Sequence, residues 1–370
     1  MTLEEFLNPD YIPPTPRLNK GSTTTYQRSY LSSKMLSGFE VEPLIEVLKK
    51  FNSLTATLHE CDRHELYRTF LIPKKTSGYR RIDAPCDELK LALTNLKNIF
   101  EENFTGVNNR CALHHTSAFA YVKGRCAVDA VKCHQMNESR WFAKFDMKNF
   151  FGSTTQEFVM KQLAMIFPFS QVMRVEEGRK ELEKAIDLAF LDGGLPQGTP
   201  ISPLITNIMM IPLDFELSKT LRHSGQNKYV YTRYADDILI SSKYDFKLEE
   251  VLGVLESVLK KYDAPFAINT KKTRYGSSSG SNWNLGVMLN KDNMITIGHK
   301  KKKQFENLLD AYAKDKKGGR AWPPEDVSRV LGLYSYYCSV EGHTVMDAIS
   351  EHIGKKHGMN IIKSMKDDLK

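Results

Sequence analysis

Residues 229–242 read Tyr-Val-Tyr-Thr-Arg-Tyr-Ala-Asp-Asp-Ile-Leu-Ile-Ser-Ser, with two consecutive acids, Asp236 and Asp237, between two apolar runs. The apolar runs are typical of β-strands, and the polar interruption is typical of a turn. Carboxylates in such a hairpin cost free energy unless a positive charge neutralises them. A divalent cation is the natural partner, although an Asp-Asp pair without apolar flanks is more often a solvated turn.

A third carboxylate, Asp146, ends the predicted strand 141–146, which reads Trp-Phe-Ala-Lys-Phe-Asp. If this strand lies beside the acidic hairpin, three carboxylates meet at one rim. Hard oxygen ligands of this kind suit Mg²⁺. Two such ions about 3.5 to 4 Å apart can stabilise both the attacking and the leaving oxygen of a phosphoryl transfer.

The composition of the chain limits the classes of protein to which it can belong. The chain has 370 residues and a net charge of +8, a mild excess that fits a polyanionic partner as well as many ordinary enzymes. Its six cysteines lack C-x-x-C spacing, which favours reduced thiols and argues against a structural zinc site. The acidic start does not resemble a secretory signal, and polar residues interrupt the apolar stretch 201–217. We therefore expect a cytoplasmic protein that does not span a membrane.

The remaining pattern mixes helices and strands. Residues 1–35 are rich in Pro, Thr and Ser and indicate an extended arm, and residues 66–85 indicate two strands around a turn. Helices are expected within 39–58, 88–104, 156–166, 177–191, 203–217, 248–262 and most of 299–370, and further strands at 266–269 and within 283–297. This mixture predicts an α+β fold.

Three motifs together resemble the palm of reverse transcriptases. They are Phe-Asp-Met-Lys-Asn-Phe-Phe at 145–151, Leu-Pro-Gln-Gly-Thr-Pro-Ile-Ser-Pro at 195–203 and Tyr-Ala-Asp-Asp at 234–237. The resemblance spans residues 61 to 340 approximately and implies a right-hand polymerase fold with an antiparallel palm sheet. It implies an N-terminal arm and helix at 1–60, fingers at 61–140, a palm at 141–297 with fingers helices inserted at 156–192, and a helical thumb at 298–370.

The resemblance also implies roles for single residues. Two Mg²⁺ ions, or Mn²⁺ in their place, would be held by Asp146, Asp236, Asp237 and the backbone carbonyl of Met147. Lys272, beside Asn269, would help to neutralise pyrophosphate. The residues expected to bind the incoming nucleotide and the template are Lys74, Arg80, Phe151, Gln197 and Gly198. For the basic residues the alternative is a solvated surface position.

Phe151 bears on the choice of sugar. In this family a bulky aromatic five residues after the first metal-binding Asp fills the space of a ribose 2′-hydroxyl, and here that residue is Phe151. The neighbouring Phe150 leaves an alternative open, because adjacent residues at a strand end point to opposite sides and only one need face the site. Leu285-Gly286 resembles the hairpin that supports the primer end.

The implied function is RNA-directed DNA synthesis for a bacterial retroelement or an anti-phage defence system. Its partners would be a dedicated non-coding RNA as template, a primer or cDNA product and dNTPs, with a homo-oligomer or an effector protein left open. Residues 129–134 differ from the retron signature N-A-x-x-H, and Asn284-Leu-Gly286 replaces V-T-G, so the subgroup stays open. Alternatives are a template-independent, protein-primed polymerase of abortive-infection type and a non-catalytic, maturase-like RNA-binding protein.

Overall fold

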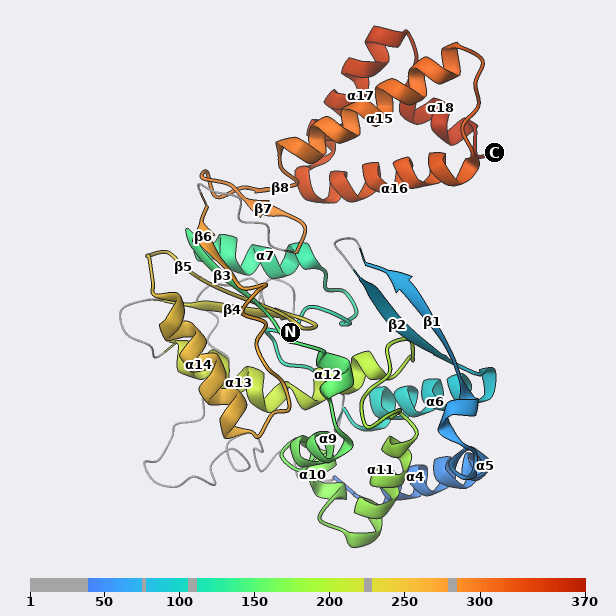
Figure 1. Cartoon of the computed structure of the whole chain (residues 1–370), viewed down its shortest axis with the longest axis vertical. Helices are drawn as coiled ribbons and strands as arrows, with labels where there is room; N and C mark the ends of the chain where they lie inside the picture. Colours follow the sequence, from blue (N-terminus) through green and yellow to red (C-terminus); the bar gives the residue numbers. More distant parts are fainter. Residues whose placement is uncertain (1–38, 75–77, 106–111, 223–227, 279–284) are drawn as a thin grey trace. The chain divides into compact units, whose positions relative to one another are not determined.

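The computed structural model describes residues 39–74, 78–105, 112–222, 228–278 and 285–370 (Figure 1). The expected N-terminal arm and Asn284 lie outside these ranges. The chain divides into two compact units. The first comprises Met1–Cys126, Ala143–Ile240 and Phe246–Arg274, and the second comprises Ala127–Phe142, Ser241–Asp245 and Tyr275–Lys370.

The first unit is mainly helical. Its helices are α4 (Glu42–Leu54), α5 (Ala56–Glu60), α6 (Asp87–Asn103), α8 (Phe150–Ser153), α9 (Gln156–Leu163), α10 (Phe169–Val172), α11 (Glu176–Asp187), α12 (Ser202–Met209), α13 (Ile211–Arg222) and α14 (Leu248–Lys261). A 3-10 turn at Arg63–Leu66 leads into strand β1. Helix α4 buries Leu44, Ile45, Leu48 and Phe51 at helical spacing and packs against α11, which confirms the helix expected within 39–58.

The helix expected at 203–217 is two helices instead. Helix α12 ends at Met209 and α13 begins at Ile211. Pro212 has no amide N–H, so it cannot donate to the carbonyl of Ile208 and a continuous helix loses that hydrogen bond.

The central sheet has strands β4 (Val230–Tyr234), β5 (Asp237–Ser242), β3 (Trp141–Asp146) and β6 (Arg274–Ser277), in that order. The predicted strand at 266–269 is wrong: Ile268 forms only an isolated bridge with Met147. The chain turns at Asn269, whose carbonyl accepts the amides of Lys272 and Thr273 at 3.0 and 3.1 Å. The sheet strand of this region is therefore β6, which follows the turn.

The hairpin predicted at 66–85 is confirmed. Strands β1 (Tyr67–Pro73) and β2 (Tyr79–Pro85) pair antiparallel, with Ile72 opposite Arg80. The amide of Lys74 donates to the carbonyl of Gly78 at 2.9 Å and closes the last described pair before the turn. Most side chains of this hairpin are exposed, so its register depends mainly on the backbone ladder.

The second unit contains α7 (Ala127–Met136), the short strands β7 (Met288–Leu289) and β8 (Ile295–Thr296), and the helices α15 (His299–Lys317), α16 (Pro324–Glu341), α17 (His343–His357) and α18 (Ile361–Asp367). The C-terminal helices, drawn in orange and red in Figure 1, enclose an apolar core of their own. Its fully buried members include Phe305, Leu309, Tyr312, Val327, Met346 and Met365.

Among the described residues, no helix combines the length and the apolar character that a membrane crossing requires.

Buried histidines give the fold a pH dependence. His134 is fully buried, and its Nδ1 lies 2.6 Å from the Ser241 hydroxyl. Burial lowers the pKa of His134 to about 3 and those of His114 and His115 to about 4. The unfolded chain binds protons at these sites near pH 6.5, whereas the folded chain does not. Stability is therefore complete above pH 6.5 and is lost as the pH falls toward these lowered pKa values.

We predict that His134→Gln makes the free energy of unfolding less sensitive to pH. The wild-type value should fall between about pH 6 and pH 4 with a contribution from His134 that approaches about 1.4 kcal/mol per pH unit. Urea unfolding at a series of pH values measures this slope. His352→Gln is the matched control because His352 is exposed. An equal slope in wild type and His134→Gln would contradict the prediction.

Candidate active site

The acidic turn joins β4 to β5 through two residues, Ala235 and Asp236. Ala235 has a positive φ of 57°, which is uncommon for a residue with a side chain. The carbonyl of Asp236 accepts the amide of Met147 at 3.1 Å. The turn is thereby tied to the residue that follows Asp146, so the carboxyl end of β3 lies beside the turn that precedes its neighbour β5, as expected if the two elements lie side by side.

Asp146 is surrounded by hydrogen-bond donors from the 269–272 turn. Its carboxylate oxygens both lie 3.1 Å from the Lys272 ammonium, and Oδ2 accepts from the Asn269 amide group at 3.3 Å. The backbone reinforces this arrangement, because the amide of Asn269 donates to the Asp146 carbonyl at 2.7 Å. The structure thus brings together Asp146, Asn269 and Lys272, which the sequence placed in one site.

The two adjacent acids have different surroundings. Asp237 pairs with Lys144 on β3, with the ammonium nitrogen 3.0 Å from Oδ1. Asp236 forms no ion pair with any described residue: burial raises its pKa, the nearby carboxylates of Asp237 and Asp146 raise it further, and the Lys272 ammonium opposes this rise. Asp236 therefore carries most of the uncompensated negative charge of the turn.

A buried ion pair between Arg233 and Asp214 stabilises the acidic turn. The side chains of Arg233 and Asp214 are both 0% exposed, and their closest nitrogen and oxygen lie 2.8 Å apart. The Tyr231 hydroxyl also donates to Asp214, at 2.6 Å. The remaining guanidinium donors of Arg233 reach the carbonyl of Ala235 and the side-chain oxygen of Asn207, each at 3.3 Å. Arg233 therefore holds the backbone of the acidic turn directly.

The same network fixes the segment before Tyr121. The Asn207 side chain donates to the Ala120 carbonyl at 2.8 Å. The backbone of Arg233 accepts from the Phe119 amide at 2.9 Å and donates to the Ser117 carbonyl at 2.7 Å. The sequence analysis did not identify this role of Arg233, because its partner Asp214 lies in a separate element, helix α13.

Phe150 and Phe151 point to different environments. Phe150 is 2% exposed, and its ring lies 4.9 Å from that of Phe266. Phe151 is half-buried, and its ring meets Tyr121 edge to face at 6.4 Å. Phe150 therefore belongs to the core. Phe151 lies at the edge of the site, beyond Asn149, whose φ of 46° turns the chain away from the strand.

Tyr121 is a site residue that the sequence analysis missed. It is 55% exposed and has a positive φ of 60°. Burial raises the pKa of its hydroxyl, the Asp236 carboxylate adds to this rise, and the Arg80 guanidinium opposes it. Tyr121 therefore lies within electrostatic reach of both the acidic turn and the β1–β2 hairpin. Its only sequence signal is the aromatic stretch 118–121 just before Gly124.

The Gln197-Gly198 turn packs against the β1–β2 hairpin. The Gln197 carbonyl accepts the amide of Asp83 at 2.8 Å. Gly198 has a φ of +132°, and a Cβ there would lie 2.8 Å from the Asp83 carbonyl oxygen. Both the backbone conformation and the close approach therefore require glycine. The structure explains Gly198 by this packing.

The basic residues of the hairpin differ in their partners. Arg81 bonds Asp83 at 2.7 Å and pairs with Asp192 at 3.1 Å, so its charge is used within the fold. Lys74 and Arg80 are exposed, and neither forms an ion pair within the described part of the chain. Both therefore remain available to a solvent-borne anion.

The chemistry of the acidic site fits a divalent cation. Asp146 and Asp236 offer hard oxygen ligands, and burial together with the neighbouring carboxylates raises the pKa of Asp236, which a bound cation would counteract. The Lys272 ammonium already occupies a place beside Asp146 where positive charge is favourable. Reverse transcriptases in general depend on such ions, and these residues are compatible with that requirement.

We predict that Arg233→Leu lowers the free energy of unfolding by about 3 to 5 kcal/mol, because it leaves Asp214 as an uncompensated buried charge. The double variant Arg233→Leu/Asp214→Leu should lose less than the sum of the two single variants, since it removes both charges. Urea unfolding gives all the values needed. Lys261→Ala, which removes an exposed partner of Glu216, is the control and should cost at most about 1 kcal/mol. A loss in Arg233→Leu no larger than in this control would refute the role of the buried pair.

Comparison with known proteins agrees with the resemblance to reverse transcriptases. The family model described as "Reverse transcriptase (RNA-dependent DNA polymerase)" matches residues 72–308. Retron Ec83 reverse transcriptase of Escherichia coli is 29% identical over 311 residues, which cover 81% of this chain and 89% of the relative. Retron Ec73 reverse transcriptase, also of Escherichia coli, is 28% identical over 275 residues, which cover 74% and 82%.

Among solved structures, telomerase from Candida albicans, determined with a fragment of telomeric RNA, shares 14% sequence identity. The alignment covers 85% of this chain and 65% of that chain, with a TM-score of 0.46. The family match confirms the expected right-hand polymerase fold of mixed helix and sheet. The chain therefore belongs to the reverse transcriptase family and is an RNA-directed DNA polymerase of a bacterial, retron-like retroelement.

Proposed function

We propose that the chain transfers dNTPs onto a primer in a reaction that depends on two Mg²⁺ ions held by Asp146, Asp236 and the Met147 carbonyl. The observation that carries this proposal is the meeting of Asp146 and the partly buried Asp236 at adjoining strand ends, without enough positive charge. When bound, divalent cations supply activation of the primer hydroxyl and neutralisation of the leaving pyrophosphate. Mn²⁺ has the same ligand preference and would serve in their place.

The other side chains orient the substrates. Lys272 is 65% exposed at its side chain and contacts Asp146 without nucleotide, so it can exchange that carboxylate for a phosphate oxygen. Asp237 is the adjacent acid, and its pairing with Lys144 keeps it near the site. Lys74 and Arg80 would bind the triphosphate as exposed cations of the hairpin. Gln197 and Gly198 would face the template and the nucleotide, supported by the contact of their turn with Asp83.

We further propose the division into arm and helix at 1–60, fingers at 61–140, palm at 141–297 and thumb at 298–370. It is supported by the exposed hairpin β1–β2, the acidic sheet and the separate core of the C-terminal helices. The net charge of +8 supports nucleic-acid partners. We propose a dedicated non-coding RNA as template and dNTPs as substrates in the cytoplasm.

We predict that Asp236→Ala lowers the rate of dNTP incorporation by at least about 10³-fold, because it removes a metal ligand from the reacting centre. The assay is extension of a DNA primer annealed to an RNA template in Mg²⁺. Asp263→Ala is the matched control, since Asp263 is an exposed carboxylate in the same unit. Wild-type extension by Asp236→Ala would refute the site. Extension without a template would favour the template-independent alternative, and RNA binding without any incorporation would favour the maturase-like one.

We also predict that Phe151 restricts the product to DNA. Its half-buried ring beside Tyr121 would lie against the sugar, so Phe151→Ala should reduce discrimination against ribonucleotides by about 10- to 10³-fold. Use of deoxynucleotides should suffer less. Single-nucleotide incorporation of dGTP against GTP measures the ratio.

Phe150→Ala is the comparison variant for this prediction. Its ring is in the core, so truncation should lower the free energy of unfolding by about 3 to 5 kcal/mol and leave the sugar preference unchanged. If Phe150→Ala relaxes the sugar preference and Phe151→Ala does not, Phe150 is the gate.

A further inference from the structure

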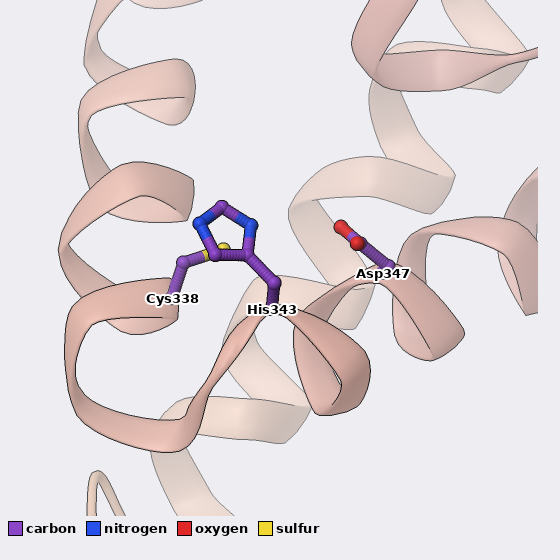
Figure 2. Close-up of side chains that lie close together, drawn as sticks. All are labelled: Cys338, His343 and Asp347. Atoms are coloured by element: carbon purple, nitrogen blue, oxygen red, sulfur yellow. The ribbon is translucent and has the colours of Figure 1, made fainter.

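A second cluster of metal-ligating side chains lies at the corner between α16 and α17, far along the sequence from the catalytic acids. Cys338 lies in the last turn of α16, and His343 begins α17. Gly342 alone joins the two helices, with a φ of 87°. The ligand atoms of Cys338, His343 and Asp347 all lie within 4.8 Å of one another (Figure 2).

The local helix geometry explains this meeting. His343 and Asp347 are four residues apart in α17 and therefore share one face of the helix. The sharp reversal at Gly342 returns the chain so that this face meets the final turn of α16, as Figure 2 shows. The spacing C-x₄-H-x₃-D lacks the paired cysteines of common zinc motifs, and for that reason the cysteine pattern alone argued against a zinc site.

Burial and neighbouring contacts favour a defined arrangement of these side chains. Cys338 is 5% exposed, Asp347 is half-buried, and His343 is exposed. The Tyr334 hydroxyl donates to Asp347 and also bonds with Cys338. The Tyr334 ring is stacked on Phe305, with the centroids 6.4 Å apart. The carboxylate is thus oriented by a side chain that is itself anchored in the core.

We propose that Cys338, His343 and Asp347 bind a zinc ion at the α16–α17 corner. Sulfur, imidazole nitrogen and carboxylate oxygen are together the donor set of Zn²⁺, whereas Mg²⁺ prefers oxygen ligands alone. Three protein ligands leave one position of a tetrahedral site for water. Tyr334 acts as the outer partner that orients Asp347, as residues behind metal ligands commonly do.

The ion would stabilise a corner on which neighbouring contacts depend. Glu341, beside Gly342, accepts the Thr296 hydroxyl and the Ile297 amide, both at 2.6 Å. It also pairs with Lys302 in the first turns of α15, at 2.7 Å. An ion that links α16 to α17 would therefore also hold the residue that anchors β8 and the start of α15.

The test is metal binding by the full chain after removal of metal with a chelator. With Co²⁺ as a probe, the wild type should show the charge-transfer absorption of a thiolate-bound ion, which the catalytic acids cannot produce because they contain no sulfur. Competition with a chromophoric chelator should give about one tight Zn²⁺ per chain. Zn²⁺ should also raise the midpoint of thermal unfolding.

Cys338→Ser should abolish the charge-transfer absorption, and His343→Ala should weaken Zn²⁺ binding by at least about 100-fold. Tyr334→Phe should weaken it by about 10- to 100-fold. His343 is exposed, so its variant tests the site even if Cys338→Ser fails to fold. Matched controls are Cys61→Ser and His352→Ala, which replace exposed residues outside the cluster. Absence of the thiolate absorption in wild type, or unchanged Zn²⁺ binding in His343→Ala, would overturn the proposal.

Discussion

The guanidinium of Arg233 and the carboxylate of Asp214 are both removed from water, and the rest of the catalytic region is arranged around them. Such a pair is favourable only when every remaining donor and acceptor finds a partner. Here those partners are the carbonyl of Ala235 and the side chain of Asn207. The hydrogen bonds that satisfy the buried charge therefore also position the acidic turn, helix α12 and the segment that leads to Tyr121.

The exposed side of the same turn has the opposite electrostatic character. In the buried ion pair, one positive charge matches one negative charge. Around the acidic turn, the three carboxylates outnumber the two lysines that pair with them. Lys272 and Lys144 each pair with one acid, whereas Asp236 forms no ion pair within the described ranges, and burial and the two neighbouring carboxylates raise its pKa. Charge left uncompensated in a folded protein reduces its stability and is characteristic of sites that bind an ion or a charged substrate.

Two glycines of the 193–198 turn allow the backbone of other segments to approach this turn closely. Gly198 lies against the Asp83 carbonyl, and Gly194 lies against the carbonyl of Gly152. In both places a Cβ would come within 3 Å of backbone atoms, so a side chain would force the elements apart. These contacts link the β1–β2 hairpin and the residues after Phe151 to the 193–198 turn. In the second unit, Gly342 acts through its backbone conformation instead: its φ of 87° allows the reversal that brings Cys338 near His343 and Asp347.

The sequence by itself determined the class of fold and pointed to the acids that we propose as catalytic. The strands 141–146, 230–234 and 237–242 contain short apolar runs, and the acids that interrupt or end these runs are visible without coordinates. The order of the three palm motifs then indicated the family, which the family match confirmed. Local turn chemistry was less certain: Pro212 divided a predicted helix, and the turn at Asn269 moved a predicted strand to 274–277.

Only the tertiary structure decided which residues act together across long separations in the chain. The pairing of Arg233 with Asp214, the place of Tyr121 beside Phe151, and the assignment of Phe150 to the core depend on packing between separate elements. The same holds for the cluster of Cys338, His343 and Asp347, whose irregular spacing matches no common motif. Periodicity reports the face of a single element, whereas these contacts depend on how several elements are oriented, and that orientation is set by the sum of many weak packing interactions.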